Sequence, residues 1–91
     1  MITLDTRLAL DPRVRFRRFE HEGIVIQQTS AEVLVVSEVA TRLLELTNGT
    51  RSLRECIILL GEEFDADEPT IEADVIRFAG ELVEAGVAAV Q

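Results

Sequence analysis

The chain has 91 residues, enough for one small domain with one hydrophobic core. Hydrophobic residues make up 47% and charged residues 29% of the sequence, which is typical of a folded globular protein. The net charge of −8 and the absence of Tyr and Trp argue against nucleic-acid binding, because that function needs clustered basic side chains and aromatic rings.

The charge is unevenly distributed along the chain. Residues 1–30 hold five Arg and four acidic residues, whereas residues 31–91 hold four Arg and thirteen acidic residues. We therefore expect the two parts to present different electrostatic surfaces.

Targeting signals and disulfides are not indicated by the sequence. The N-terminus lacks a basic segment followed by an apolar run, and the longest apolar run, Cys56–Leu60, is far too short to span a bilayer. Because Cys56 is the only cysteine, no intrachain disulfide can form. We expect a cytoplasmic protein with no membrane association.

Residues 1–12 are interpreted as a poorly patterned N-terminal arm, and residues 13–91 as the single domain. After the arm, apolar and basic residues alternate from Val14 to Arg17, which predicts a strand with one exposed face. The order of apolar and basic residues reverses at Arg18-Phe19, which predicts a bulge near Arg17.

Two further strands are expected after a turn at Glu20–Gly23, in which Gly23 would adopt a positive φ angle. They cover residues 24–28 and Glu32–Val36. The short connections predict an antiparallel meander with the last strand at an edge, unless the first strand lies outside it. Because side chains alternate across a strand, Val33-Leu34-Val35-Val36 is apolar on both faces, and the second face needs a cover.

The remaining sequence predicts three helices. Ser37 is suited to cap a helix that ends at Asn48-Gly49, and its Glu38 and Arg42 are spaced to form an ion pair. Ser52 and Glu55 form a capping box at the start of a second helix over residues 53–63. A third helix is expected over residues 68–85.

The third helix carries more apolar surface than one packing face requires. Its apolar side chains cover roughly half of the circumference, compared with the ~100° stripe of an ordinary surface helix. Residues 87–90 are predicted to form a terminal strand or a tail lying on the core. The order of elements indicates an α+β fold, a three-stranded antiparallel meander followed by three helices.

No catalytic, cofactor or metal site is apparent. His21 is interpreted as a solvated turn residue and Cys56 as a small buried hydrophobe. The acidic residues at positions 65, 67 and 68 lack the other ligands of a calcium loop and are interpreted as a solvated helix start. We expect no enzymatic activity.

The arginines of the first strand, Arg13, Arg15, Arg17 and Arg18, allow two interpretations. They keep an exposed sheet face hydrated, or they meet an acidic partner. The first interpretation is favoured, because isolated exposed charges contribute little energy.

From about Pro12 to Val87 the chain resembles the PqqD-like family, also called the RiPP recognition element. The shared pattern is a meander, a helix opening with Ser and an Ala three residues later, a Gly-containing turn, a short helix, and a last helix carrying Asp, Phe and Leu at four-residue spacing before a Gly. In this sequence the pattern falls on Ser37, Ala40, Asn48–Ser52, Asp74, Phe78, Leu82 and Gly86.

The resemblance implies a winged-helix-like, non-catalytic peptide chaperone. Family members bind the leader of a ribosomally made precursor peptide and deliver it to a modifying enzyme, often a radical S-adenosylmethionine enzyme. The leader is added as a strand beside the third strand and packs against the third helix. Carried onto this chain, the peptide-binding residues are Glu32, Val33, Leu34, Val35, Val36, Ile71, Asp74, Val75 and Phe78.

Several alternatives remain open. Members that serve pyrroloquinoline quinone synthesis tend to have an apolar stretch between the second and third strands, whereas this chain has residues 27–32, QQTSAE, which favours a related peptide natural-product pathway. The apolar strand could instead be covered by Ile2-Thr3-Leu4 or by a second copy of the chain, and both a monomer and a homodimer are possible. A winged-helix DNA-binding regulator would need a basic recognition helix, yet acidic residues dominate the third helix. An adaptor that binds only the modifying enzyme, and not the peptide, is a further alternative.

Overall fold

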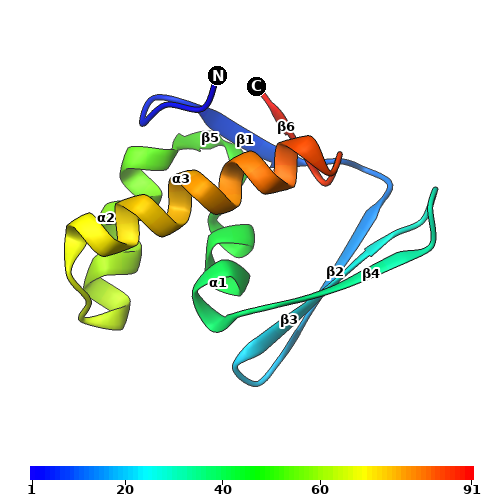
Figure 1. Ribbon diagram of the computed structural model, residues 1–91, viewed down its shortest axis with the longest axis horizontal. Coiled ribbons are helices and arrows are strands. Elements are labelled where there is room, and N and C mark those ends of the chain that lie inside the picture. The colour runs from blue at the N-terminus through cyan, green and yellow to red at the C-terminus, as the bar shows by residue number, and fades with distance from the viewer.

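The structure is a computed structural model that describes all residues 1–91. It contains two antiparallel sheets and three helices (Figure 1), and it confirms the α+β class and the meander followed by helices. The meander has the order β2-β3-β4, and a second sheet has the order β5-β1-β6. The elements are β1 (Arg7–Leu10), β2 (Val14–Phe19), β3 (Glu22–Gln27), β4 (Glu32–Val36), α1 (Glu38–Leu46), β5 (Asn48–Ser52), α2 (Leu53–Phe64), α3 (Glu68–Glu84) and β6 (Ala88–Val90).

The helices begin where the sequence predicts. The Ser37 hydroxyl accepts a hydrogen bond from the Ala40 N–H at 3.2 Å, which caps α1. The predicted capping box between Ser52 and Glu55 is present at the start of α2. Pro69 lies in the first turn of α3, where its missing N–H leaves no intrahelical hydrogen bond unmade.

The predicted bulge near Arg17 is wrong. The pairing of β2 with β3 runs without a register shift, with Arg17 opposite Ile24 and Arg18 opposite Gly23. Phe19 simply points to the solvent side of the sheet, where it is 60% exposed. A change in the hydrophobic pattern therefore marks an exposed aromatic residue here and not an extra residue in the strand.

Gly23 does not supply the positive φ angle of the turn, as the sequence suggested. That conformation is adopted by Glu20, at φ 55°, whereas Gly23 lies within β3. A Cβ atom on Gly23 would lie 2.5 Å from the Thr41 hydroxyl oxygen and 2.9 Å from Cε1 of Phe16. The glycine is needed because α1 packs closely against this strand.

Strands β1 and β5, and with them the second sheet, were not anticipated from the sequence. Residues 7–10 lie within the expected N-terminal arm, yet they form β1, which pairs with β5 on one side and β6 on the other. Leu8 is 1% exposed and belongs to the core. Residues 88–90 form a terminal strand, which decides between the two options left open for this segment.

The predicted ion pair between Glu38 and Arg42 is also absent. Arg42 instead donates to Glu63 of α2 at 2.8 Å and to Glu45 at 3.5 Å. Glu45 in turn accepts from Arg18 of β2 at 2.7 Å. These alternating charges connect β2, α1 and α2 in one network.

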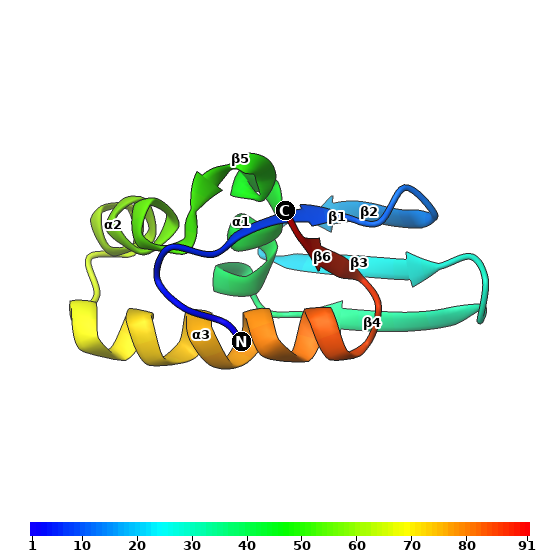
Figure 2. The ribbon, with the colours of Figure 1, turned by 90° about the horizontal axis from the view of Figure 1, so that it is seen from above.

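The core lies among the helices and the second sheet. Val25 is the only residue of the meander in the main core cluster, where it is 1% exposed. The meander therefore packs on α1 through one face and projects beyond the helices (Figure 2). A hydrogen bond of 2.7 Å from the Gln27 side chain to the Ala85 carbonyl also ties β3 to the end of α3.

Candidate functional site

Strand β4 is an open edge of the meander. It pairs with β3 along its length, from Gln27–Glu32 to Gly23–Val36, and with no other strand. Outside the sheet ladders, no backbone hydrogen bond involves any residue from 32 to 36. Half of the backbone groups of β4 are therefore free to pair with another chain.

The register identifies which backbone groups face outward. The N–H of Gln28, directly after β3, donates to the carbonyl of Arg13 at 3.3 Å. Because backbone groups alternate in direction along a strand, the even-numbered residues of β3 also direct theirs toward β2. The odd-numbered residues of β3 therefore face β4 and bond to their partners Glu32, Leu34 and Val36. By the same alternation, Val33 and Val35 direct their N–H and C=O groups away from the sheet.

The side chains of β4 remain exposed on both faces. Val33 and Val35 point away from the helices and are 59% and 65% exposed, while Leu34, on the helix side, is 37% exposed. The N-terminal segment does not cover them, because Ile2 and Leu4 pack against the core and the carbonyl of Leu4 accepts a hydrogen bond from the N–H of Arg54 in α2. The alternative in which Ile2-Thr3-Leu4 roofs this strand is therefore wrong.

A hollow of about 320 Å³ separates β4 from α3. Its walls come from β4, the start of α1 and the C-terminal half of α3, and most of them are apolar. Figure 2 shows α3 and β4 on the same side of the molecule, so a chain lying along the free edge of β4 would also reach α3. The lining residues are Leu34, Val35, Val36, Ser37, Ala40, Phe78, Glu81 and Leu82.

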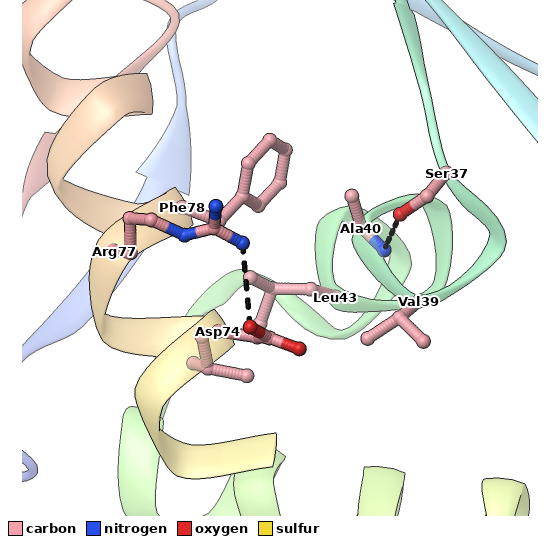
Figure 3. A pocket seen from close by; sticks show the side chains of 8 residues that line it. Ser37, Val39, Ala40, Leu43, Asp74, Arg77 and Phe78 are labelled. Carbon is pink, nitrogen blue, oxygen red and sulfur yellow. Dashed lines mark hydrogen bonds and ion pairs between the residues drawn. The ribbon is translucent and has the colours of Figure 1, made fainter. Parts of the chain in front are cut away.

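A second hollow of about 150 Å³ adjoins the first, between α1 and α3 (Figure 3). Phe78, Ser37 and Ala40 line both hollows. The two spaces thus form one groove that begins beside β4 and continues between the helices. The remaining residues of the second hollow are Val39, Leu43, Asp74, Val75 and Arg77.

Charged side chains occupy the rim of this groove. Asp74 and Arg77 form an ion pair of 3.3 Å at one end, and their side chains are 51% and 69% exposed. Glu81 borders the hollow beside β4. Glu32, at the start of β4, is exposed as well. The groove therefore combines an apolar floor with a mainly acidic rim.

The structure gathers most of the expected peptide-binding residues around the groove. Leu34, Val35, Val36, Asp74, Val75 and Phe78 line its hollows, while Glu32 and Val33 lie on the adjoining edge. Val75 is 1% exposed and contributes to the floor. Ile71 is 3% exposed and lines neither hollow, so it supports the groove from within the core.

Part of the groove was not found from the sequence. The opposite wall is formed by the N-cap Ser37 and by Val39, Ala40 and Leu43 of α1, for which the sequence indicated only a helix. On α3, the residues Arg77, Glu81 and Leu82 extend the groove along the helix. The presence of Ser37 and Ala40 in the family pattern was the available signal.

The two side chains considered for chemistry lie apart. His21 is 80% exposed in the β2–β3 turn, with its Nδ1 atom 3.4 Å from Glu38. Cys56 is 1% exposed in α2, and burial raises the pKa of its thiol. Both placements agree with the interpretation as a turn residue and a buried hydrophobe. No helix in the structure is both long and apolar enough to cross a bilayer.

A family model described as coenzyme PQQ synthesis protein D (PqqD) matches residues 22–88, from β3 to the start of β6. The chain belongs to the PqqD family. Its relatives in this family include a PqqA binding protein from Xanthomonas axonopodis pv. citri (strain 306), 35% identical over 81 residues that cover 89% of this chain and 88% of the relative. A PqqA binding protein from Gluconobacter oxydans (strain 621H) is 34% identical over 76 residues, with coverage of 80% and 79%. The resemblance seen in the sequence is confirmed.

Two solved structures have the same fold. The PqqD truncation of Methylobacterium extorquens PqqCD, described as a stand-alone RiPP recognition element, matches with a TM-score of 0.80 at 23% identity and covers 98% of this chain and 95% of its own. TbiB1 in complex with the TbiA(beta) leader peptide matches with a TM-score of 0.78 at 18% identity, covering 88% and 93%. This PqqD-family chain therefore shares its architecture with a structure that holds a leader peptide.

Proposed function

We propose that the protein is a non-catalytic chaperone that binds the leader region of a ribosomally made precursor peptide and presents it to a modifying enzyme. The observation that carries this proposal is the free edge of β4 beside an apolar groove. Main-chain groups of Val33 and Val35 would bond to an extended guest strand. The hollow lined by Leu34, Phe78 and Leu82 would select its apolar side chains.

The family supports this function from two sides. The relatives at 35% and 34% identity are named for binding PqqA, and a chain of the same fold is seen with a leader peptide. The physical features of this chain agree with such a role, since an exposed apolar strand edge is a liability unless a partner covers it.

Titration calorimetry with the leader of the precursor peptide encoded beside this chain tests the proposal. We expect one-to-one binding with a dissociation constant in the micromolar range or below, and a negative heat-capacity change from burial of apolar surface. Absence of any binding heat at several temperatures would contradict the proposed function.

A second candidate function is service to the pyrroloquinoline quinone pathway itself. It is favoured by the relatives named PqqA binding protein. The polar segment at residues 27–32 argued against it in the sequence, and in the structure Gln27 bonds to the Ala85 carbonyl at the end of α3. Parallel titrations with PqqA and with the neighbouring precursor distinguish the two, because the physiological leader should bind more tightly.

A further inference from the structure

The solvent-facing side of the meander, the outer face, carries a second apolar surface. It lies opposite the face that packs on α1, and no helix covers it. Phe19 is 60% exposed there, and Val33 and Val35 are 59% and 65% exposed. The strand pairing assigns its members as Arg15, Arg17, Phe19, Glu22, Ile24, Ile26, Val33 and Val35.

The four arginines at positions 13, 15, 17 and 18 differ in whether they have an acidic partner. Arg13 is paired with Asp11, and Arg18 with Glu45. Arg15 and Arg17, in contrast, are exposed and have neither an ion pair nor a side-chain hydrogen bond. In a chain of net charge −8, these two unpaired guanidinium groups lie directly beside an apolar surface.

We propose that the outer face docks the modifying enzyme, through a surface with an apolar centre and carboxylates opposite Arg15 and Arg17. This inference rests on the proposed function, because the groove and the edge of β4 are then occupied by the leader. The face is suited to protein contact because apolar side chains form its middle and charges lie to one side. Carboxylates on the enzyme would be repelled by the acidic remainder of this chain and attracted by Arg15 and Arg17. The two arginines would therefore orient the enzyme toward the outer face as it binds.

A second copy of this chain is a poorer occupant. A symmetric dimer through the outer face would place β2 against either β2 or β4 of the other copy. The first arrangement brings arginines together, and the second places Arg15 and Arg17 over Val33 and Val35. The only carboxylate on the strands of this face is Glu22, so most of the positive charge would be buried unpaired.

The leader itself would extend the outer face. Alternate side chains of a strand added to β4 point to the same side as Val33 and Val35. An enzyme docked there would contact the bound leader as well as the chaperone. Leader and enzyme should therefore strengthen each other's binding by the same factor.

Two double variants with equal change in charge test the docking. The outer-face variant combines Arg15→Glu and Arg17→Glu and reverses the charge of the outer face. The control variant combines Arg7→Glu and Arg54→Glu and reverses two charges on β1 and α2. The probe is the peptide-modifying enzyme encoded beside this chain. Surface plasmon resonance measures its affinity for each variant, with and without the leader. We expect the outer-face variant to bind the enzyme about tenfold more weakly or worse, with leader affinity within about twofold of wild type. The control variant should match wild type in both measurements.

Several outcomes would overturn the docking proposal. They are unchanged enzyme binding by the outer-face variant, no enzyme binding by wild type, or loss of a wild-type dimer in this variant while enzyme binding persists. Leader titration of the wild type tests the proposed function separately, so a failed docking surface and a failed leader site give different results. A Phe19→Ser variant, which leaves the charges intact, should also weaken enzyme binding.

Discussion

Gly23 shows how tightly the meander is held against α1. Its missing side chain allows Thr41 and Phe16 to approach, and a Cβ atom would lie within 3.0 Å of both. This contact fixes the meander relative to the helices that form the other wall of the groove. The position of β4 therefore depends on a residue that lies outside the groove.

We expect Gly23→Ala to lower the free energy of unfolding by about 1–3 kcal/mol, because the added methyl group overpacks this contact. Gly61→Ala is the matched control. Nothing lies within 4 Å of a Cβ atom at Gly61 of α2, so this change should raise stability by about 0.5–1 kcal/mol through helix propensity. Urea unfolding measures both, and equal effects of the two substitutions would contradict the packing argument.

Arg42 should make stability depend on pH in the acidic range. Hydrogen bonds from Arg18 and Arg42 lower the pKa values of Glu45 and Glu63, respectively, below their ordinary range. Groups with a lowered pKa in the folded state stabilise it above the pKa of the unfolded chain, and the gain is lost as pH falls through the lowered value. Arg42→Gln should therefore cost about 0.5–1 kcal/mol at neutral pH and much less near pH 3. A cost that stays constant across urea unfolding experiments at both pH values would rule out the charge network as its cause.

At the scale of elements, β4 has backbone groups of two kinds. We expect Val35→Pro to weaken leader binding at least tenfold while the domain remains folded, because Val35 directs its N–H outward. Leu34→Pro removes an N–H that bonds to β3 and should also destabilise the sheet. Circular dichroism with thermal unfolding separates the two effects, and full leader affinity in the Val35→Pro variant would exclude strand addition at this edge.

The helix side of the groove is tested by Phe78, which lines both hollows. Phe78→Ser should weaken leader binding about tenfold or more, because it removes the largest apolar side chain of the groove. Ile58→Ser is the control, since Ile58 is 48% exposed on α2 and lines a separate hollow. Calorimetry should show weaker leader binding for the Phe78→Ser variant alone. Equal losses of leader affinity in both variants would mean that the leader does not bind in this groove.

Elements with strong periodicity were predictable from the sequence, whereas those built by distant pairing were not. Both α2 and α3 end within one residue of the expected bounds, because their apolar spacing and their N-terminal residues are local signals. β1 and β5 have only four and five residues, and β5 is largely polar. Their stability comes from pairing between segments about 40 residues apart, which leaves no local pattern.

The same distinction applies to the candidate site. Strand β4 was recognisable because four consecutive apolar residues have no hydrated face. The α1 wall of the groove arises from the way α1 and α3 pack, which no single segment encodes. Ile71 was expected in the groove because the family resemblance places the leader against the third helix, but helix packing turns its side chain into the core.

For the molecule as a whole, the uneven charge along the sequence becomes a difference between two surfaces. The groove has a mainly acidic rim with Asp74 and Glu81, while the outer face of the meander carries Arg15 and Arg17. The two surfaces meet at β4, whose side chains alternate between them. A leader strand added at this edge would contribute side chains to both.

Residue-resolved hydrogen exchange with and without the leader peptide tests strand addition to β4 most directly. We expect the amides of Val33 and Val35 to exchange quickly in the free protein and to become protected when the leader binds. The amide of Leu34, which already bonds to β3, should change much less. Protection that appears only on α2 or on the β5-β1-β6 sheet, with Val33 and Val35 still exchanging quickly in the complex, would contradict it.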